Sequence, residues 1–272
     1  MGRNEESTNV ELIIESALKV PGVKVNRKEF LVRVFSDKLS EDKIPDLIEK
    51  GPLEVGISKE KINRIAKSLV SKRTLQSSGT SFVAGIPGGW TMAATIPADT
   101  LQFFGVALRL SQELAYLFGY KDFWNEEELD IERIKSELIL FLGVMFGVGG
   151  AASTLKVVSS KVAQQALRKI PQKALTKTFY YPIIKKIAAI IGVKITKDTF
   201  AKGVSKIIPV VGGVVSGGLT YTTMTKMGNS LRNAMLDTLD YSQQDFKKDI
   251  NEIKNSMSDI IDMEFEEIAE GS

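Results

Sequence analysis

The side chains that could carry out chemistry in this chain are those of Asp, Glu, Lys, Tyr and Ser, because its 272 residues include no cysteine and no histidine. Without cysteine there can be no disulfide, thiol nucleophile or cysteine-ligated metal centre. Without histidine, the commonest general base and the commonest transition-metal ligand are missing. The sequence therefore excludes serine–histidine hydrolases, cysteine–histidine proteases and histidine-ligated zinc enzymes, and it predicts no catalytic residue, metal site or cofactor.

Asp99 is the one isolated acid in a long apolar region, since no other acidic residue lies between Ile62 and Gln112. A lone carboxylate in such a region can be a proton or ion site, and a carboxylate-dependent enzyme would use it first. Asp99 also follows Pro97 closely. Proline and a carboxylate together are typical of the first turn of a helix, where the carboxylate meets the positive end of the helix dipole. We favour the helix start and keep a functional acid as the alternative.

Residues 156–206 form a strongly basic segment, with twelve Lys and Arg residues against one acid. Its lysines are interleaved with apolar and aromatic residues, as in KTFYYPIIKKIAAIIGVKITK. Such a segment suits a membrane interface, where apolar side chains enter the headgroup region and ammonium groups meet anionic lipid. The alternative is a solvated helix face that the protein's own acidic segments, 122–137 and 237–272, neutralise. We expect lipid contacts from Lys177, Tyr180, Tyr181, Lys185, Lys186, Lys194 and Lys197.

Two other ligands of basic or glycine-rich segments are disfavoured. The basic segment holds eleven lysines but one arginine, Arg168, whereas specific recognition of bases and phosphates depends on arginine forks. A nucleic-acid partner is therefore not expected. The glycine-rich piece GVGGAAST (147–154) has no lysine after its glycines. The two glycine motifs that bind nucleotides, G-x-x-x-x-G-K-S/T and G-x-G-x-x-G, do not occur in the chain. We interpret these glycines as packing residues.

Helices must position these residues, because apolar residues recur mostly at helical spacing and few stretches alternate strictly. Short amphipathic helices are predicted within residues 8–50. A further helix is predicted to start at Ser58, which would cap it, and another runs from about Pro97 to Phe118. An acidic amphipathic helix or helix pair is predicted from about Leu231. The predicted fold is all-α, a multi-helix domain with glycine-rich apolar helical hairpins.

Three stretches carry no charged residue: 74–98, 138–155 and 207–225. Each is close to the length that spans a bilayer, yet each also contains several Gly, Ser or Thr residues, and two contain proline. Small residues allow helices to approach closely, both in soluble hairpins and between membrane helices. Three interpretations stay open: a tightly packed core, shallow or conditional membrane insertion, and a spanning helix.

The overall composition fits a globular protein, with 43% hydrophobic and 25% charged residues. We divide the chain into N-terminal amphipathic helices (1–57), a central helical domain (58–235) and an acidic C-terminal helix (236–272). The start of the chain is acidic and polar, unlike a signal peptide, and its Met-Gly pair fits the myristoylation pattern poorly. A cytoplasmic location, at the cytoplasmic face of the membrane, is expected.

Three pieces of the chain resemble the EcsC protein family and related bacterial proteins. These are SFVAGIPGGWTMAATIPADTLQFFGVALRLSQELAYLFGY, LFLGVMFGV and FAKGVSKIIPVVGGVVSGGLTY, within roughly residues 58–235. The family is named for a protein encoded beside the ATPase and membrane subunits of an ABC exporter. The resemblance implies a helical bacterial protein acting near the cytoplasmic membrane, with an ABC transporter as a possible partner. It implies no catalytic residues.

The function expected from the sequence is that of a non-catalytic, membrane-associating helical protein, which binds an anionic lipid surface through its lysine-rich apolar segment. Three alternatives stay open. The first is a soluble protein-interaction module that docks on a membrane transporter or another partner. The second is a membrane-perturbing effector, and the third is a carboxylate-dependent enzyme.

Overall fold

The computed structural model describes residues 2–77, 98–125, 130–160, 180–195 and 217–258. These residues contain ten α-helices and no β-strand, so the predicted all-α, multi-helix fold is confirmed. The helices of the N-terminal half are α1 (Gly2–Leu18), α2 (Arg27–Phe35), α3 (Ile44–Lys50), α4 (Lys59–Ser77) and α5 (Ala98–Leu117). Those that follow are α6 (Ile131–Met145), α7 (Ala151–Ser159), α10 (Tyr181–Ile195), α12 (Gly217–Asp237) and α13 (Gln243–Ser256).

Polar side chains mark where several helices begin. Asn26, Ser58 and Asp130 each accept a hydrogen bond from the backbone N–H three residues ahead, at 2.9, 3.3 and 3.0 Å. They satisfy amide groups that have no partner within the first turn. Ser242 and Asp245 form a reciprocal capping box at the start of α13. The predicted cap at Ser58 is therefore confirmed.

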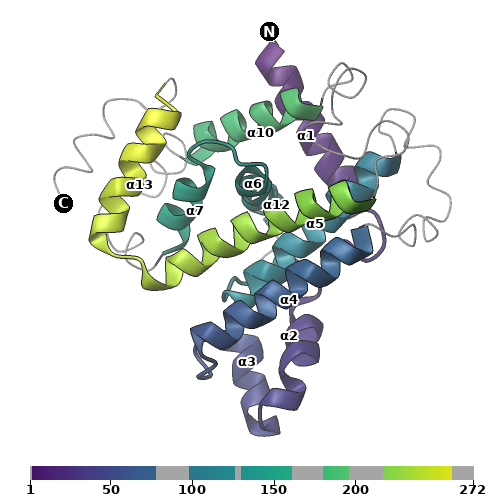
Figure 1. The fold of residues 1–272 in the computed structure, drawn as a ribbon, viewed down its shortest axis with the longest axis vertical. Coiled ribbons are helices and arrows are strands. Elements are labelled where there is room, and N and C mark those ends of the chain that lie inside the picture. Colours follow the sequence, from purple (N-terminus) through teal and green to yellow (C-terminus); the bar gives the residue numbers. More distant parts are fainter. Residues whose placement is uncertain (1, 78–97, 126–129, 161–179, 196–216, 259–272) are drawn as a thin grey trace.

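Helix α6 lies at the centre of the molecule. Figure 1 shows it nearly end-on, with α5, α7, α10 and α12 around it. Every residue from Leu138 to Met145 is buried, as is most of α7. The charge-free stretch 138–155 is thus part of the hydrophobic core. Most of the other two, 74–98 and 207–225, falls outside the described residues.

Two glycines permit the closest helix crossings. A Cβ on Gly143 of α6 would lie 2.5 Å from a methyl group of Ile187 on α10. A Cβ on Gly228 of α12 would lie 2.8 Å from Val70 of α4 and 2.9 Å from Leu110 of α5. Real Cβ atoms do not come so close to their neighbours. Gly143 lies in the charge-free stretch 138–155, so the predicted use of small residues for tight packing is confirmed there; Gly228 lies just beyond the stretch 207–225 and was not part of that prediction.

Helix α12 continues past Leu231, where the acidic C-terminal helix was predicted to begin. Its buried residues Met224, Met227, Leu231 and Met235 recur every three or four positions, so one apolar stripe continues through Leu231. The predicted start of the acidic helix at about Leu231 is therefore wrong. The acidic amphipathic helix is α13, which begins at Gln243 after a single 3-10 turn, Thr238–Asp240.

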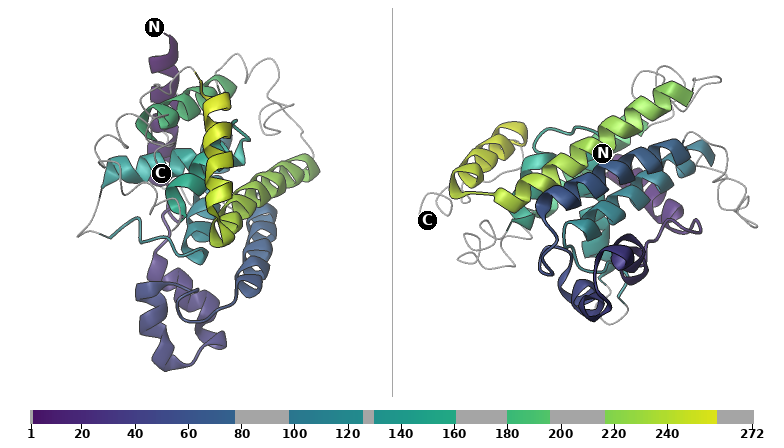
Figure 2. Two further views of the ribbon diagram at one scale, coloured as in Figure 1. Left: turned by 90° about the vertical axis from the view of Figure 1, so that its left-hand side faces the viewer. Right: turned by 60° about the horizontal axis from the view of Figure 1, so that its bottom comes forward.

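One hydrophobic core joins the described helices, from Val10 of α1 to Met257 after α13. It includes residues from all three predicted segments, 1–57, 58–235 and 236–272, whose boundaries stay a prediction. Helices α2 and α3 lie at one end of the molecule, away from α10 and α13, as the two views of Figure 2 and Figure 1 show together. Within the described ranges, no helix combines the length and the apolar character needed to cross a bilayer.

Candidate functional site

Helix α10, which carries most of the described part of the predicted lipid-binding segment, has two different sides. Ile183, Ile187 and Ile191 are fully buried, on the side that packs against α1 and α6. Their spacing of four residues places them in one row along the helix. The α10 backbone comes close to α6 because Gly143 leaves room for Ile187. One side of the helix is thereby fixed in the core.

Tyr181 and Lys185 lie on the outer side of α10. The Tyr181 side chain is 41% exposed, which places it among the most exposed large apolar or aromatic residues that the structure describes. The Nζ atom of Lys185 lies 5.4 Å from the centroid of the Tyr181 ring, a distance typical of a cation–π contact. These two predicted lipid contacts are therefore neighbours, and both face solvent.

The remaining predicted contacts are placed differently. Lys186 is half-buried and donates a hydrogen bond to the backbone carbonyl oxygen of Ser256, at 3.2 Å. Tyr180 is less exposed than Tyr181, and burial raises the pKa of its phenol above the usual range. Lys194 belongs to the last turn of α10, and only its backbone is described. Lys177 and Lys197 lie outside the described residues.

Asp99 is the second residue of α5, so the predicted helix start is confirmed. The side chain of Asp99 lies outside what the structure describes. Its possible role as a functional acid stays a prediction.

A shallow crevice runs beside the outer side of α10, between α1 and α6. Its charged and aromatic lining comes from Glu11, Glu132, Lys135, Tyr181 and Lys185. The Nζ atom of Lys135 lies 2.6 Å from Glu15 and 3.7 Å from Glu132, and the hydrogen bond to Glu15 raises the pKa of this lysine. Lys135 is thus neutralised within the protein, whereas Lys185 is the exposed cation of the crevice.

The second turn of α6 holds a carboxyl group with an unusual protonation equilibrium. Burial raises the pKa of Glu137 to about 7. Arg133, whose guanidinium lies 3.4 Å from Glu137, opposes this shift, and Asp130 adds to it. A carboxyl group that titrates near neutral pH suits proton transfer. Glu137 was not singled out from the sequence.

Three arginines surround one buried carboxylate on α5. Glu113 is fully buried and accepts two hydrogen bonds from Arg73 of α4, one of them at 2.6 Å. The Nε atom of Arg109, one helical turn earlier, lies 3.4 Å from the same carboxylate. The Nη2 atom of Arg33, on α2, lies 3.8 Å from it. This group, called here the arginine cluster (Arg33, Arg73, Arg109 and Glu113), joins three helices.

The same part of α5 also fixes the loop between α1 and α2. The buried Gln112 side chain donates to the carbonyl of Val23 at 3.0 Å and accepts from the N–H of Val25 at 3.1 Å. The Tyr116 hydroxyl donates to the Val25 carbonyl at 3.1 Å, and Arg109 donates to the carbonyl of Gly22 at 2.5 Å. Neighbouring residues of α5 thus satisfy backbone groups of this loop, including those of the buried Val23 and Val25.

The sequence analysis missed the arginine cluster, although one signal of it was available. Arg109 and Glu113 are four residues apart, the spacing at which opposite charges meet on a helix, and they interrupt an otherwise apolar helix. Arg33 and Arg73 lie 80 and 40 positions before Glu113, and no local pattern links them to it.

A second buried carboxylate attaches α13 to α7. Asp249 is 1% exposed, and it accepts hydrogen bonds from the hydroxyls of Ser153 at 2.8 Å and Tyr241 at 2.7 Å. The Nζ atom of Lys156 lies 2.8 Å from the same carboxylate. Three donors of the protein thus hold this carboxylate, so the cluster serves as an attachment between helices. No group of acidic residues that could hold a metal ion occurs in the described ranges.

Comparison of the chain with protein-family models, curated proteins and solved structures finds no match in any of the three.

Proposed function

We propose that this chain is a non-catalytic helical protein that associates with anionic membrane surfaces through the lysine-rich segment containing α10. The observation that supports this most directly is the two-sided character of α10. Its isoleucines Ile183, Ile187 and Ile191 are buried, whereas Tyr181 and Lys185 face solvent side by side. Because α1 and α6 hold the isoleucine side in the core, the side that would meet a lipid surface is the one that carries Tyr181 and Lys185.

The proposed contact combines two kinds of side chain. A lysine near an anionic lipid surface contributes about 1 kcal/mol. A tyrosine ring places its apolar body toward the acyl chains while its hydroxyl stays in the polar headgroup region. Lys185 and Tyr181 would supply one of each. Lys177, Lys194 and Lys197 would add further cations if the segment lies along the surface, which makes several contacts available for stable attachment.

The resemblance of residues 58–235 to the EcsC protein family gives the proposal a cellular setting. We propose a bacterial protein at the cytoplasmic face of the membrane, with a transporter in that membrane as a possible partner. This setting depends on the three sequence pieces that carry the resemblance, and the lipid contact depends on α10. The two parts can therefore be tested separately.

Flotation of the folded full-length protein with liposomes tests the lipid contact. We expect flotation with vesicles that contain anionic phospholipid at low salt, little flotation with purely zwitterionic vesicles, and a loss of binding at high salt because ions screen the contact. Replacing Lys185→Glu should weaken binding about tenfold, since the reversal turns an attraction into a repulsion.

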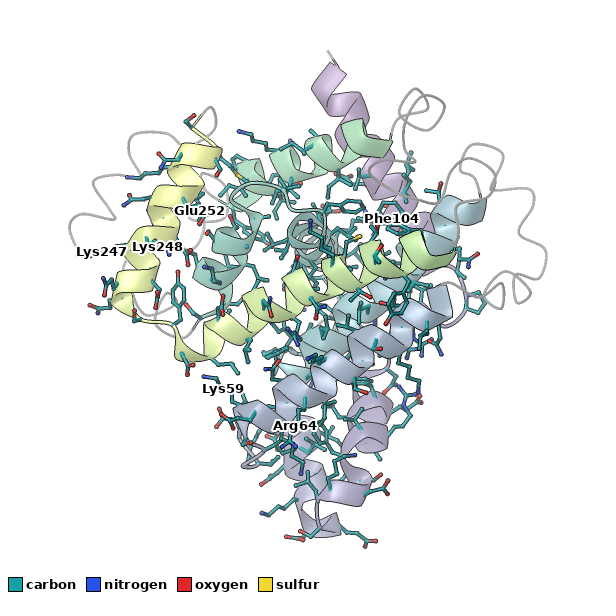
Figure 3. All side chains as sticks on the ribbon, viewed as in Figure 1. Lys59, Arg64, Phe104, Lys247, Lys248 and Glu252 are labelled. Atoms are coloured by element: carbon teal, nitrogen blue, oxygen red, sulfur yellow. The ribbon has the colours of Figure 1, made fainter. Side chains whose placement is uncertain are left out.

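Lys247→Glu is the matched control, because Lys247 is also exposed but points outward from α13 (Figure 3). Both replacements change the net charge equally, so a specific α10 contact requires that only the Lys185 variant loses binding. Equal losses, or no flotation of the folded wild type at low salt, would reject the proposal. Release of a trapped dye from the same vesicles would identify the membrane-perturbing form of this function.

A second candidate, a protein-interaction module, is supported by the crevice beside α10. In its lining Tyr181 is 41% exposed, and Glu132 and Lys185 supply charges of both signs. Ile131, which precedes Glu132 at the start of α6, is 45% exposed. Exposed aromatic and apolar residues with charges around them are typical of transient protein interfaces.

Photo-crosslinking in cells tests this second candidate. A photoreactive amino acid in place of Tyr181 should give a discrete crosslink to a membrane transporter subunit, and the same amino acid in place of the exposed Gln244 on α13 should not. Crosslinks to lipid alone from position 181 would favour the first candidate over the second.

A further inference from the structure

The geometry of the arginine cluster points to a binding site for a phosphate group, and we propose that Arg33 and Arg109 hold such a group against α5. The chemistry is that of a tetrahedral oxyanion bound by guanidinium groups. A tetrahedral phosphate oxyanion occurs in free phosphate, in soluble phosphate monoesters and in lipid headgroups. The proposal goes beyond the membrane contact of α10 and does not depend on it.

The charges of the cluster do not balance. Arg33, Arg73 and Arg109 bring three positive charges, and Glu113 is the one carboxylate within 4 Å of any of them in the described part of the chain. Burial, together with the positive charge of Arg73, lowers the pKa of the Arg109 guanidinium. Of the two positive charges in excess, that of Arg109 is partly buried, and such a charge is costly unless a counter-charge is present. A phosphate dianion would supply the two missing negative charges.

The hydrogen bonds already made show which arginines can receive a ligand. Arg73 is 9% exposed, and each of its three guanidinium nitrogens donates to Glu113 or Gln76. Arg109 is 22% exposed, and its Nε and Nη1 atoms donate to Glu113 and to the carbonyl of Gly22. Arg73 is therefore occupied, whereas Arg109 keeps one nitrogen that no described residue accepts from.

Arg33 is the accessible member of the cluster. Its side chain is 60% exposed, and its guanidinium makes no hydrogen bond to any described residue, since 3.8 Å to Glu113 is too long for one. It is held in place by Glu113 and by the ring of Phe30, which lies 5.8 Å from the guanidinium carbon. A guanidinium that is positioned but has open donors is ready to bind a phosphate with two parallel hydrogen bonds.

The cluster is also placed apart from the proposed lipid contact. Helix α2, which carries Arg33, lies at the opposite end of the molecule from α10 (Figures 1 and 2). A phosphate bound there would be held between α2 and α5, next to the turn at Gly22. The failure of one proposal would therefore leave the other intact.

Thermal unfolding of the full-length protein with inorganic phosphate tests the site. Phosphate should replace chloride at constant ionic strength, so that screening does not change. A ligand that binds the folded state raises the melting temperature in a saturable way, and this is the expected result. Arg33→Gln should weaken the apparent affinity roughly tenfold, which corresponds to the loss of one charge-assisted hydrogen-bonding group.

Arg64→Gln is the matched control. Arg64 is an exposed arginine of α4, near its start (Figure 3), and its loss changes the net charge equally. Lys185→Glu should also keep the phosphate response, since it lies on α10. No saturable rise in the wild type would overturn the proposal, and so would equal losses in the Arg33 and Arg64 variants.

Vesicles distinguish the source of the phosphate. Phosphatidate carries a phosphate monoester, whereas phosphatidylglycerol of equal surface charge carries a diester. A preference for phosphatidate that disappears in Arg33→Gln would assign the site to a lipid headgroup. A response to free phosphate without such a preference would assign it to a soluble phosphate compound. Both results uphold the site and name its ligand.

Discussion

Glu113 is the residue on which three helices of the molecule depend. It is fully buried, and Arg33, Arg73 and Arg109 approach it from α2, α4 and α5. Arg73 and Arg109 donate hydrogen bonds to this carboxylate, and Arg33 adds a longer ionic contact at 3.8 Å. Such a group adds little stability compared with an apolar core, but losing one partner leaves the others without a counter-charge. Replacing Glu113 alone should therefore lower the free energy of unfolding by more than the ion pairs contribute to it.

We expect Glu113→Gln to lower the free energy of unfolding by about 3–5 kcal/mol, because the three guanidinium groups would lose their carboxylate. Urea unfolding followed by circular dichroism, in a buffer free of phosphate, measures this change. Glu29→Gln, at an exposed position one turn before Arg33, is the control and should change the value by about 0.5 kcal/mol or less. If the Glu113 variant is as stable as the control, the three arginines do not need the Glu113 carboxylate as their counter-charge.

The raised pKa of Glu137 predicts that the stability of the protein depends on pH. Since burial raises its pKa from 4.5 to about 7, the folded protein holds a proton that the unfolded chain releases between these values. This contribution to stability is complete below about pH 4.5 and is lost as the pH rises through about 7. Glu137→Gln should therefore reduce the stability difference between about pH 5 and pH 8, by on the order of 2 kcal/mol.

Denaturant unfolding at both pH values measures this difference for the wild type and for the variant. Glu132→Gln is the control on the same helix, because its side chain is 71% exposed. Its pH dependence should match that of the wild type. Parallel pH profiles for the wild type and the Glu137 variant would contradict the raised pKa.

At the scale of helices, α13 is attached to the rest of the fold by a polar contact as well as an apolar one. Ile250 and Ile253 pack into the core, while Asp249 accepts hydrogen bonds from α7 and from Tyr241. An apolar stripe permits some sliding, whereas an acceptor with several fixed donors does not. Asp249 thus sets the register of α13 on α7.

Asp249→Ala should loosen α13 without unfolding α6. Hydrogen–deuterium exchange read by mass spectrometry should show roughly 100-fold faster exchange in residues 243–256, since the loss leaves the half-buried Lys156 without its partner. Lys247→Ala, on the outward side of the same helix (Figure 3), should leave the exchange rates unchanged. Unchanged protection in the Asp249 variant would mean that the apolar contacts alone hold α13.

Helix α5 shows how much could be predicted from the sequence. The signals at its ends are local, a proline and carboxylate at the start and a glycine after the end, and the predicted range from about Pro97 to Phe118 agrees with Ala98–Leu117. Gly119 adopts a φ of +90°, a conformation that favours glycine. Local rules of this kind act within a few residues and are readable without a structure.

What α5 and α6 contact could not be predicted. The partner of Glu113 is 40 residues earlier in the chain, and three-dimensional packing alone brings Arg73 to it. The uncharged second half of α6, residues 138–145, is equally compatible with a protein interior and with a lipid environment, because both favour uncharged side chains. The lipid contacts proposed for α10 were predicted from composition, and of these residues Tyr181 and Lys185 lie on the outer surface.

At the scale of the whole molecule, α1 is part of the central fold. It packs against α10 and α5, and its residues Val10, Ile14 and Ala17 are fully buried in the same core as α6. A segment that contributes to a shared core is expected to unfold with it in one cooperative transition. The N-terminal helices, first separated from the rest by composition, should therefore not melt on their own.

Ile14→Ala should lower the free energy of unfolding of the entire chain by about 2–4 kcal/mol, because it leaves a cavity in the shared core. Far-ultraviolet and near-ultraviolet circular dichroism should report the same shifted transition. Leu12→Ala on the same helix is the control, since Leu12 is 49% exposed, and its transition should scarcely move. An early, separate transition in the Ile14 variant would instead identify an independent N-terminal unit.

The fluorescence of Trp124 should report on the position of the loop between α1 and α2. Its indole N–H donates to Gln112 at 2.8 Å, and the ammonium group of Lys24 lies 4.6 Å from its ring centroid. Indole emission shifts in colour when a nearby charge or hydrogen bond is removed. Any rearrangement that lifts the turn at residues 22–25 away from α5 would therefore change the fluorescence spectrum, and replacing Trp90, the other tryptophan, by phenylalanine would make that signal unambiguous.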